Sequence, residues 1–194
     1  MEKIAYTLSR SNRKTIGLRV APDGSIEVRA PLFCPKREID GFVLKSMDWI
    51  EKQRAKLMAA GSAAEEEGLI TGEELDALAA EMVKKLKERL PVFADRLGVS
   101  YFRVTVRNQK TKWGSCSAKG NLNFNVLLML APEEVFDYVL IHELCHRRHM
   151  DHSKEFWALV ASLDPDYKKH KKWLRDNGGR LMARMYPSGG TRDE

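Results

Sequence analysis

Apolar and polar residues alternate over the first thirty residues of the chain. The alternation covers three short sets, at residues 4–8, 16–20 and 26–28. Period two with one apolar face is typical of half-buried β-strands. Ala21–Gly24 places Pro second and Gly fourth, as a type I turn prefers. We therefore expect the chain to open as an antiparallel β-meander.

The spacing of apolar residues changes after Lys36. From Ile39 to Leu57 they fall three, four or seven positions apart, which predicts a helix. Residues 59–68 lack large apolar side chains and are interpreted as a linker or a helix extension. Thr71 and Glu74 resemble a capping box and open a second helical stripe. This stripe should be kinked or restarted at Pro91 and should end at Gly98.

The second half of the chain repeats the change from strand to helix. Residues 101–107 and the segment beginning at Asn121 alternate, which predicts two strands. Pro132 suits the first position of a helix, Ser153 can cap the next one, and a third should end at residues 177–179. The order of elements indicates an α+β fold. The expected divisions are an N-terminal meander and helix (1–60), a linker (61–70), a second subdomain (71–186) and a mobile tail (187–194).

Composition narrows the class of protein. The chain has 194 residues, of which 43% are hydrophobic and 31% charged, and a net charge of +6. These values are typical of a globular protein, and the basic excess favours an anionic partner without indicating nucleic acid by itself. No apolar run approaches the length of a bilayer span, and the N-terminus lacks a signal-peptide core. The three cysteines suggest no disulfide framework. We expect a cytoplasmic protein with no membrane partner.

Four of the five histidines lie between His142 and His152. His142 and His146 are four residues apart, so on a helix both imidazoles face one way and can reach one ion. Glu143 directly follows His142, and the three residues form the H-E-x-x-H motif found on helices of zinc metallopeptidases. A histidine near a helix end is usually an ordinary polar group. Four in eleven positions, with the acid in place, favour a Zn²⁺ site with Glu143 as general base.

A catalytic zinc usually takes a third protein ligand. His149 would lie about 10.5 Å along the helix from His142 if that helix continued, which is too far. The helix should therefore end near residues 148–150 and let His152 return to the site. Glu155 is the carboxylate alternative. Asp151 and Asp164 are the candidates for outer hydrogen-bond partners of the ligands.

Other reactive residues near the motif have ordinary interpretations. Cys145 is one position off the His142/His146 pair and is expected in the core. His149 is interpreted as a turn residue, and His170 as an isolated polar group. The chain has no G-x-S-x-G elbow, Walker loop or dinucleotide fingerprint. Hydrolysis by a metal-activated water is the simplest chemistry left.

Several motifs occur together in a fixed order along the chain. They are "KWGSCS" (112–117), "NLNFN" (121–125), "DYVLIHELCH" (137–146), "DHSKEFW" (151–157) and "PDYKKHKKWL" (165–174). Together with "RSNRKTIGLRVAPDGSIEVRAP" near the N-terminus, they resemble the YgjP family of predicted metal-dependent hydrolases, relatives of SprT-like and WLM peptidases. The resemblance covers nearly the whole chain, although Lys112 stands where many members have Arg. It implies a zincin: a small sheet beside the H-E-x-x-H helix, followed by two more helices. It also supports His152 as third ligand. The metzincins share that spacing but have Gly at the position of His149.

Residues around the motif suggest how a substrate would bind. Trp113, Asn123 and Tyr167 are weaker candidates for substrate contact, and Trp113 is better explained by core packing. The strand containing Asn123 could be an edge strand that pairs with an extended peptide. Tyr167 or His170 could supply a donor to an oxyanion.

Three functions remain open from the sequence. The preferred one is a zinc metallopeptidase acting on peptide or protein substrates. The second is a metal-dependent nucleotide pyrophosphatase or phosphohydrolase, although no phosphate loop or Asp cluster is visible. The third is a zinc-containing nucleic-acid or protein adaptor, suggested by a basic face made of Lys168, Lys171, Lys172 and Arg175. Glu143 argues against a structural metal, which would need a fourth protein ligand instead.

Overall fold

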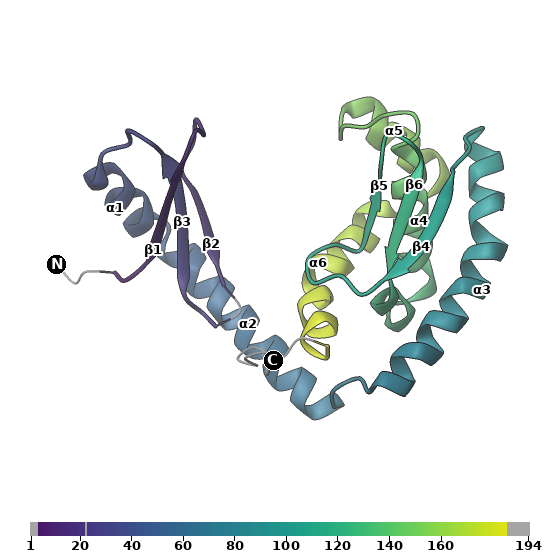
Figure 1. Cartoon of the computed structure of the whole chain (residues 1–194), viewed down its shortest axis with the longest axis horizontal. Helices are drawn as coiled ribbons and strands as arrows, with labels where there is room; N and C mark the ends of the chain where they lie inside the picture. Colours follow the sequence, from purple (N-terminus) through teal and green to yellow (C-terminus); the bar gives the residue numbers. More distant parts are fainter. Residues whose placement is uncertain (1–3, 22, 186–194) are drawn as a thin grey trace.

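The computed structural model describes residues 4–21 and 23–185. Within these residues, the chain forms two small β-sheets, each followed by helices, and a long helix that runs from one sheet toward the other (Figure 1). The fold is therefore α+β, as the sequence predicts. The expected tail (187–194) lies outside the described residues, as does Pro22 of the expected turn at 21–24. The division into subdomains stays a prediction.

The first sheet packs one face against a helix. Its strands are β1 (Thr7–Ser11), β2 (Gly17–Val20) and β3 (Ile26–Pro31), and the helix is α1 (Lys36–Lys45). Ile26, Val28 and Ala30 alternate along β3 and are all buried. They form a small core with Ile39 and Val43 of α1. The opposite face of the sheet carries polar residues such as Arg29. Alternation therefore predicted β2 and β3 correctly, whereas β1 begins three residues later than the set at 4–8.

The antiparallel meander expected for these strands is wrong. The strand order is β1-β3-β2, and β1 runs parallel to β3 while β2 is antiparallel to it. Alternation fixes which side chains share a face, but not which strand is the neighbour. Leu8 and Leu18 both lie level with Val28 in the observed sheet. The Arg10 guanidinium holds β1 in place by donating to the carbonyl oxygens of residues 31, 32 and 34 at 2.8–3.0 Å.

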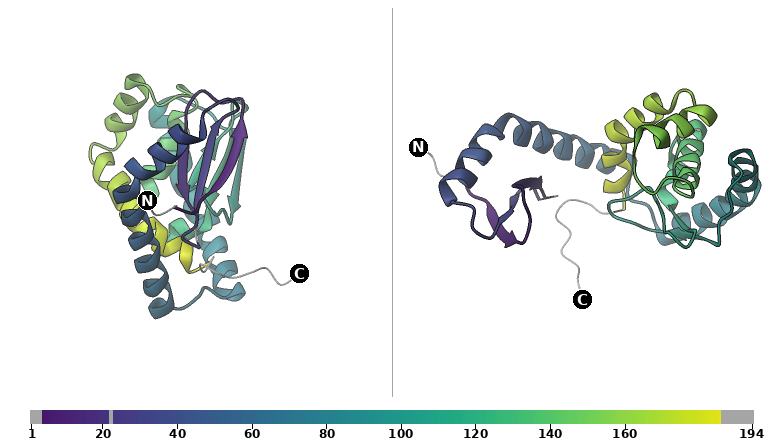
Figure 2. Two further views of the ribbon diagram at one scale, coloured as in Figure 1. Left: turned by 90° about the vertical axis from the view of Figure 1, so that its left-hand side faces the viewer. Right: turned by 90° about the horizontal axis from the view of Figure 1, so that it is seen from above.

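Helix α2 (Met47–Glu67) connects the two parts of the molecule. It is helical through residues 59–67, so this segment is a helix extension. The far half of α2 packs against the last helix, α6 (Tyr167–Ala183). Glu67 forms ion pairs with Arg180 and Arg184 at 3.0 and 3.6 Å. The right-hand view of Figure 2 shows the first sheet set apart from the second, with α2 running between them.

Helix α3 (Gly72–Leu97) begins at the expected capping box. Glu74 N–H donates to Thr71 Oγ1 at 3.2 Å, and Thr71 N–H donates to the Glu74 carboxylate at 2.8 Å. The helix continues through Pro91 and ends at Gly98, whose φ of +62° suits glycine. On its inner face, Arg89 pairs with Glu133 and Asp137 and so ties α3 to the helix that carries the histidines.

The second sheet has the same strand order as the first. Its strands are β4 (Arg103–Arg107), β5 (Gly114–Cys116) and β6 (Asn121–Asn125), arranged β4-β6-β5 with β4 parallel and β5 antiparallel to β6. The expectation that β6 is an edge strand is therefore wrong. Leu122 and Phe124 of β6 are fully buried, because β6 crosses the middle of the core. The edge strands are β4 and β5.

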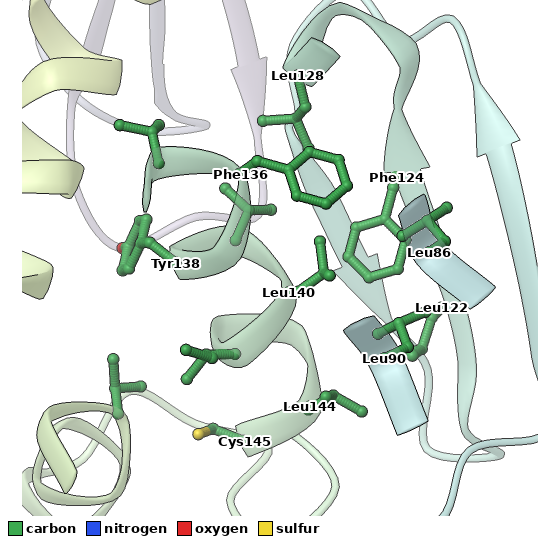
Figure 3. Close-up of a cluster of buried hydrophobic side chains, with 14 of the residues drawn as sticks. Leu86, Leu90, Leu122, Phe124, Leu128, Phe136, Tyr138, Leu140, Leu144 and Cys145 are labelled. Carbon is green, nitrogen blue, oxygen red and sulfur yellow. The ribbon is translucent and has the colours of Figure 1, made fainter. Parts of the chain in front are cut away.

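Helices cover the inner face of this sheet. After a short 3-10 helix, η1 (Val126–Leu130), come α4 (Glu133–Cys145), α5 (Lys154–Leu163) and α6. Phe124 of β6 and Phe136 and Leu140 of α4 point toward one another, with Leu86 and Leu90 of α3 beside them (Figure 3). This core packs against one face of α4. The C-terminal end of α4 carries the candidate site.

The last helix is longer than expected. The sequence predicts an end at residues 177–179, but α6 runs to Ala183. One of the two glycines there serves close packing. A Cβ on Gly178 would lie 2.9 Å from the Trp113 ring, whereas one on Gly179 would make an ordinary contact of 3.7 Å with Ala60 of α2. A small residue is needed where neighbouring elements approach closely, and that need explains Gly178 better than a helix end does.

Candidate metal centre

Helix α4 places His142, Glu143 and His146 at its C-terminal end. Pro132 precedes its first turn, and Glu133 and Glu134 lie near the positive end of the helix dipole. His142 is partly exposed, whereas Glu143 is only 5% and His146 only 9% exposed. A helix that buries nearly every side chain thus ends in a group of polar residues.

The chain reverses direction directly after α4. The helix ends at Cys145, slightly earlier than expected, and the N–H groups of Arg148 and His149 both donate to the Cys145 carbonyl. His146 Nδ1 lies 2.9 Å from the His149 carbonyl oxygen. Helix α5 then begins at the predicted cap, where Ser153 Oγ accepts from the N–H of Phe156 at 3.4 Å. This turn brings His152 back beside α4.

The three histidines converge. Their candidate ligand atoms all lie within 4.8 Å of one another, and His142 Nε2 is 3.2 Å from His152 Nε2. Two nitrogens bound to one tetrahedral zinc at about 2.05 Å would be roughly 3.3 Å apart. Glu155, the alternative third ligand, is not part of this group in the described residues. The donor set and its spacing fit a zinc ion.

The surroundings keep the His142 and His146 imidazoles neutral, which is the form that binds a metal. Burial lowers the pKa of His142 to about 3, and the nearby His146 and His152 act in the same direction. Burial also lowers the pKa of His146, partly offset by the contact with the His149 carbonyl. A cation can therefore bind to His142 and His146 without displacing a proton from either imidazole.

Asp151 and Asp164, the two candidates from the sequence, do not hydrogen-bond to the three converging histidines. His146 Nδ1 contacts a main-chain carbonyl, a common way to fix a ligand ring. Asp151 instead accepts from Ser153 N–H, and Asp164 contacts His170 Nδ1 at 2.8 Å. His142 Nδ1 is buried and has no hydrogen-bond partner among residues 4–21 and 23–185.

Glu143 lies between α4 and the edge strand β5. A Cβ on Gly114 would lie 2.7 Å from Glu143 Cγ and Oε1, so glycine is required for the carboxyl group to fit. Burial raises the pKa of Glu143 to about 8 in the metal-free chain, and the charge of Lys112 opposes this rise. A group with a pKa near neutrality can both take and return a proton.

Aromatic rings line the α5 and α6 side of the histidines. Phe156 stacks on His146, and Trp157 stacks on His152 with ring centroids 5.6 Å apart. Tyr167, a residue considered for substrate contact, stacks on the Trp157 ring at 5.2 Å. The structure therefore brings Tyr167 to the edge of the site. Phe156 and Trp157 belong to the apolar residues of α5, and nothing in the sequence indicated that they would contact the histidines.

The remaining candidates lie away from the histidines. Asn123 faces the opposite side of the sheet, where it contacts Arg107 and Ser115 at 3.0 and 3.1 Å. Trp113 packs against Gly178 of α6, in agreement with core packing. Cys145 is fully buried, as expected. Gly114 is the residue that the sequence analysis missed, because only the fold brings β5 against Glu143.

Comparisons with known proteins give the class and the family of this chain, a metallohydrolase of one metallopeptidase domain family. The model of the YgjP-like metallopeptidase domain matches residues 14–82 and 75–177. The chain belongs to this family. None of the curated proteins matches it.

Two solved structures are similar to part of the chain. The metallopeptidase zymogen abylysin of Pyrococcus abyssi is 27% identical, with a TM-score of 0.43 over 46% of this chain and 92% of its own. The zymogen jannalysin of Methanocaldococcus jannaschii is 18% identical, with a TM-score of 0.42 over 46% of this chain and 93% of its own.

Proposed function

We propose that this protein is a zinc metallopeptidase that hydrolyses peptide bonds, with His142, His146 and His152 as metal ligands and Glu143 as general base. The observation that carries this proposal is the convergence of three imidazoles beside a buried carboxyl group on the same helix. Three neutral nitrogen ligands with an adjacent, non-ligating acid are typical of a catalytic zinc site. Membership of a metallopeptidase domain family supports peptides as the substrate class.

Each residue has a distinct task in this reaction. When bound, zinc supplies a Lewis acid that polarises the scissile carbonyl and lowers the pKa of the attacking water. Glu143 accepts the proton of that water at its carboxylate and later returns it to the leaving amine. Gly114 packs directly against the Glu143 side chain and so limits where its carboxyl group can lie. His149 contributes its carbonyl, which orients the His146 ring.

Strand β5 is the element best suited to hold the substrate. It is an edge strand, so one side of its main chain is free of a neighbouring strand, and it lies directly beside Glu143. An extended peptide can add to such an edge through main-chain hydrogen bonds and so align its backbone with the site. Tyr167, which stacks on Trp157 beside His152, is the candidate oxyanion donor.

None of the described helices combines the length and apolar character that crossing a lipid bilayer requires.

The test is digestion of an unfolded protein mixture by the zinc-loaded chain beside Glu143→Gln. We expect peptide products from the wild-type chain, at least 100-fold fewer from the variant, and equal zinc content in both. Loss of zinc from Glu143→Gln would make Glu143 a ligand. Release of pyrophosphate from nucleoside triphosphates without any peptide cleavage would favour a phosphohydrolase and contradict the proposal.

A further inference from the structure

Two lysine side chains lie on the aromatic wall beside the histidines. Lys171 Nζ is 4.1 Å from the centre of the Trp157 ring, and Trp157 itself stacks on His152. Lys168, one helical turn earlier, places its ammonium group 6.0 Å from the centre of the Tyr167 ring. Residues three apart share one side of a helix, so both cations of α6 face the same wall. Cation–π contact positions such groups without neutralising them.

These two lysines differ from the other basic residues of the same helix. Lys169 pairs with Asp166 at 2.8 Å, and Lys172 and Arg175 pair with Asp176 at 2.6 and 3.3 Å. Lys168 and Lys171 have no carboxylate within ion-pair distance in the described part of the chain. The positive charge that remains available on α6 is therefore concentrated on the side nearest the histidines.

A third cation lies on the other side of the site. The main-chain carbonyl of Lys112 accepts a hydrogen bond from Asn125 at 2.9 Å, which fixes the loop before β5. Two residues later, Gly114 contacts Glu143. The charge of Lys112 acts on the Glu143 carboxyl group, so Lys112 lies on the Glu143 side of the site. A peptide bound along β5 would therefore pass between cations.

We propose that the wall formed by Trp157, Tyr167, Lys168 and Lys171 is a specificity subsite for an acidic side chain, Asp or Glu, next to the scissile bond. This inference rests on the proposed peptidase function. The aromatic rings pack against the methylene groups of such a side chain, and Lys171 pairs with its carboxylate. Lys171 is the specificity-determining residue, and Lys168 contributes additional positive charge.

The experiment compares peptides that differ at one position. A library of acetylated and amidated peptides first locates the bonds that the zinc-loaded chain cleaves. Glu, Gln and Lys are then placed in turn at the positions flanking one such bond. At one flanking position, kcat/KM should be about fivefold higher for Glu than for Gln, near the upper limit for an exposed ion pair, and lower still for Lys. The preference for Glu should shrink in 0.5 M salt because salt screens the pair.

Two variants assign the preference to a residue. Lys171→Glu should reverse the order so that the Lys peptide becomes the best substrate. Lys172→Gln is the matched control, since it removes a neighbouring exposed cation that is already paired with Asp176. This control should keep the preference for Glu. Reversal by Lys171→Glu together with an unchanged Lys172→Gln would establish the subsite.

A binding measurement gives a readout that does not depend on turnover. Fluorescently labelled Glu and Gln peptides are titrated into Glu143→Gln, and into the same variant carrying Lys171→Glu. The first protein should bind the Glu peptide about fivefold more tightly than the Gln peptide, and the second should not. A free peptide C-terminus offers the same carboxylate chemistry, so each peptide is also tested without amidation.

The outcomes separate this inference from the proposed function. Equal kcat/KM for Glu and Gln peptides at every flanking position would overturn the acidic subsite and leave the peptidase intact. A preference that appears only with the free C-terminus would show that the chain end is recognised, and would overturn the side-chain assignment. If no peptide in the library is cleaved, the proposed function fails and the subsite fails with it.

Discussion

At the residue scale, the site depends on a buried acid placed among neutral bases. Glu143 has a raised pKa because it is buried between α4 and β5, whereas burial lowers the pKa of His142. Both shifts favour uncharged side chains, which lowers the cost of burying the group before a metal binds. Both side chains are therefore uncharged in the metal-free fold at neutral pH, and the shifted pKa of Glu143 carries a cost in stability that can be measured.

The raised pKa of Glu143 predicts how the stability of the metal-free protein depends on pH. Its folded pKa, about 8, exceeds the unfolded value of 4.5, so its contribution to stability is lost as pH rises between these values. Metal-free Glu143→Gln should therefore be more stable than the metal-free wild-type chain at pH 7.5. That difference should shrink by about 2 kcal/mol at pH 5.5. Urea unfolding at both pH values measures it.

The comparison isolates Glu143 because both proteins keep His142 and His146. Those histidines have lowered pKa values, so their contribution acts in the opposite direction and is lost as pH falls below about 6.5. It cancels when the two proteins are compared at one pH. An equal stability difference at pH 7.5 and 5.5 would show that Glu143 titrates normally in the fold.

Gly114 should be required for activity. An added Cβ would lie 2.7 Å from Glu143 Oε1 and would push the carboxyl group out of place. We expect Gly114→Ala to retain zinc and to lower kcat at least tenfold, since small displacements of a catalytic group cost large factors in rate. Gly61→Ala in α2, with nothing within 4 Å of its added Cβ, is the control and should leave kcat unchanged. Full activity in Gly114→Ala would refute the assigned position of Glu143.

At the scale of secondary-structure elements, short contacts between helices and loops hold the site together. Gly178 lets α6 approach Trp113, whose carbonyl accepts from Asn125 N–H at 2.8 Å at the end of β6. Asn125, fully buried, also donates to the carbonyls of Gln109 and Lys112. These contacts fix the loop that leads into β5, so α6 helps to position an edge strand far from it in sequence.

Two adjacent glycines give a matched test of this packing. A Cβ at position 178 would lie 2.9 Å from a rigid indole ring, whereas a Cβ at position 179 would make an ordinary contact of 3.7 Å. Gly179→Ala should stabilise the protein by about 0.5–1 kcal/mol through helix propensity. Gly178→Ala should lower stability by about 1–3 kcal/mol because of overpacking. Chemical unfolding measures both, and equal effects would contradict the role given to Trp113.

The sequence predicted local structure better than strand neighbours. Caps and periodicity located α3, α5 and every strand except β5, because these signals depend on residues close in the chain. The three residues of β5 are too few to show an alternation. The pairing of β1 with β3 and the central position of β6 could not be predicted from such signals, because the order of strands depends on contacts distant in sequence. The same limit applies to the site. The spacing of His142, Glu143 and His146 was visible, whereas the contact of Gly114 with Glu143 and the wall at Lys171 required the fold.

At the scale of the whole molecule, two units of similar topology are joined by the α2–α6 contact. Both sheets have their first strand parallel and their second strand antiparallel to a central third strand, and a helix follows each (Figure 1). Only the second unit carries the histidines. Glu67 and its two arginine partners fasten α2 to α6. We therefore propose that the metal binds beside the second sheet, with His142 and His146 before one turn of the chain and His152 after it.

The most direct test of this account is the metal content of the purified protein, measured by elemental analysis after zinc is supplied and excess is removed. The wild-type chain should hold about one zinc, and His142→Ala and His152→Ala should hold almost none. Glu155→Ala, which removes the rival third ligand, should keep its zinc. A wild-type chain without zinc, or retention in His152→Ala with loss in Glu155→Ala, would contradict the proposed metal centre.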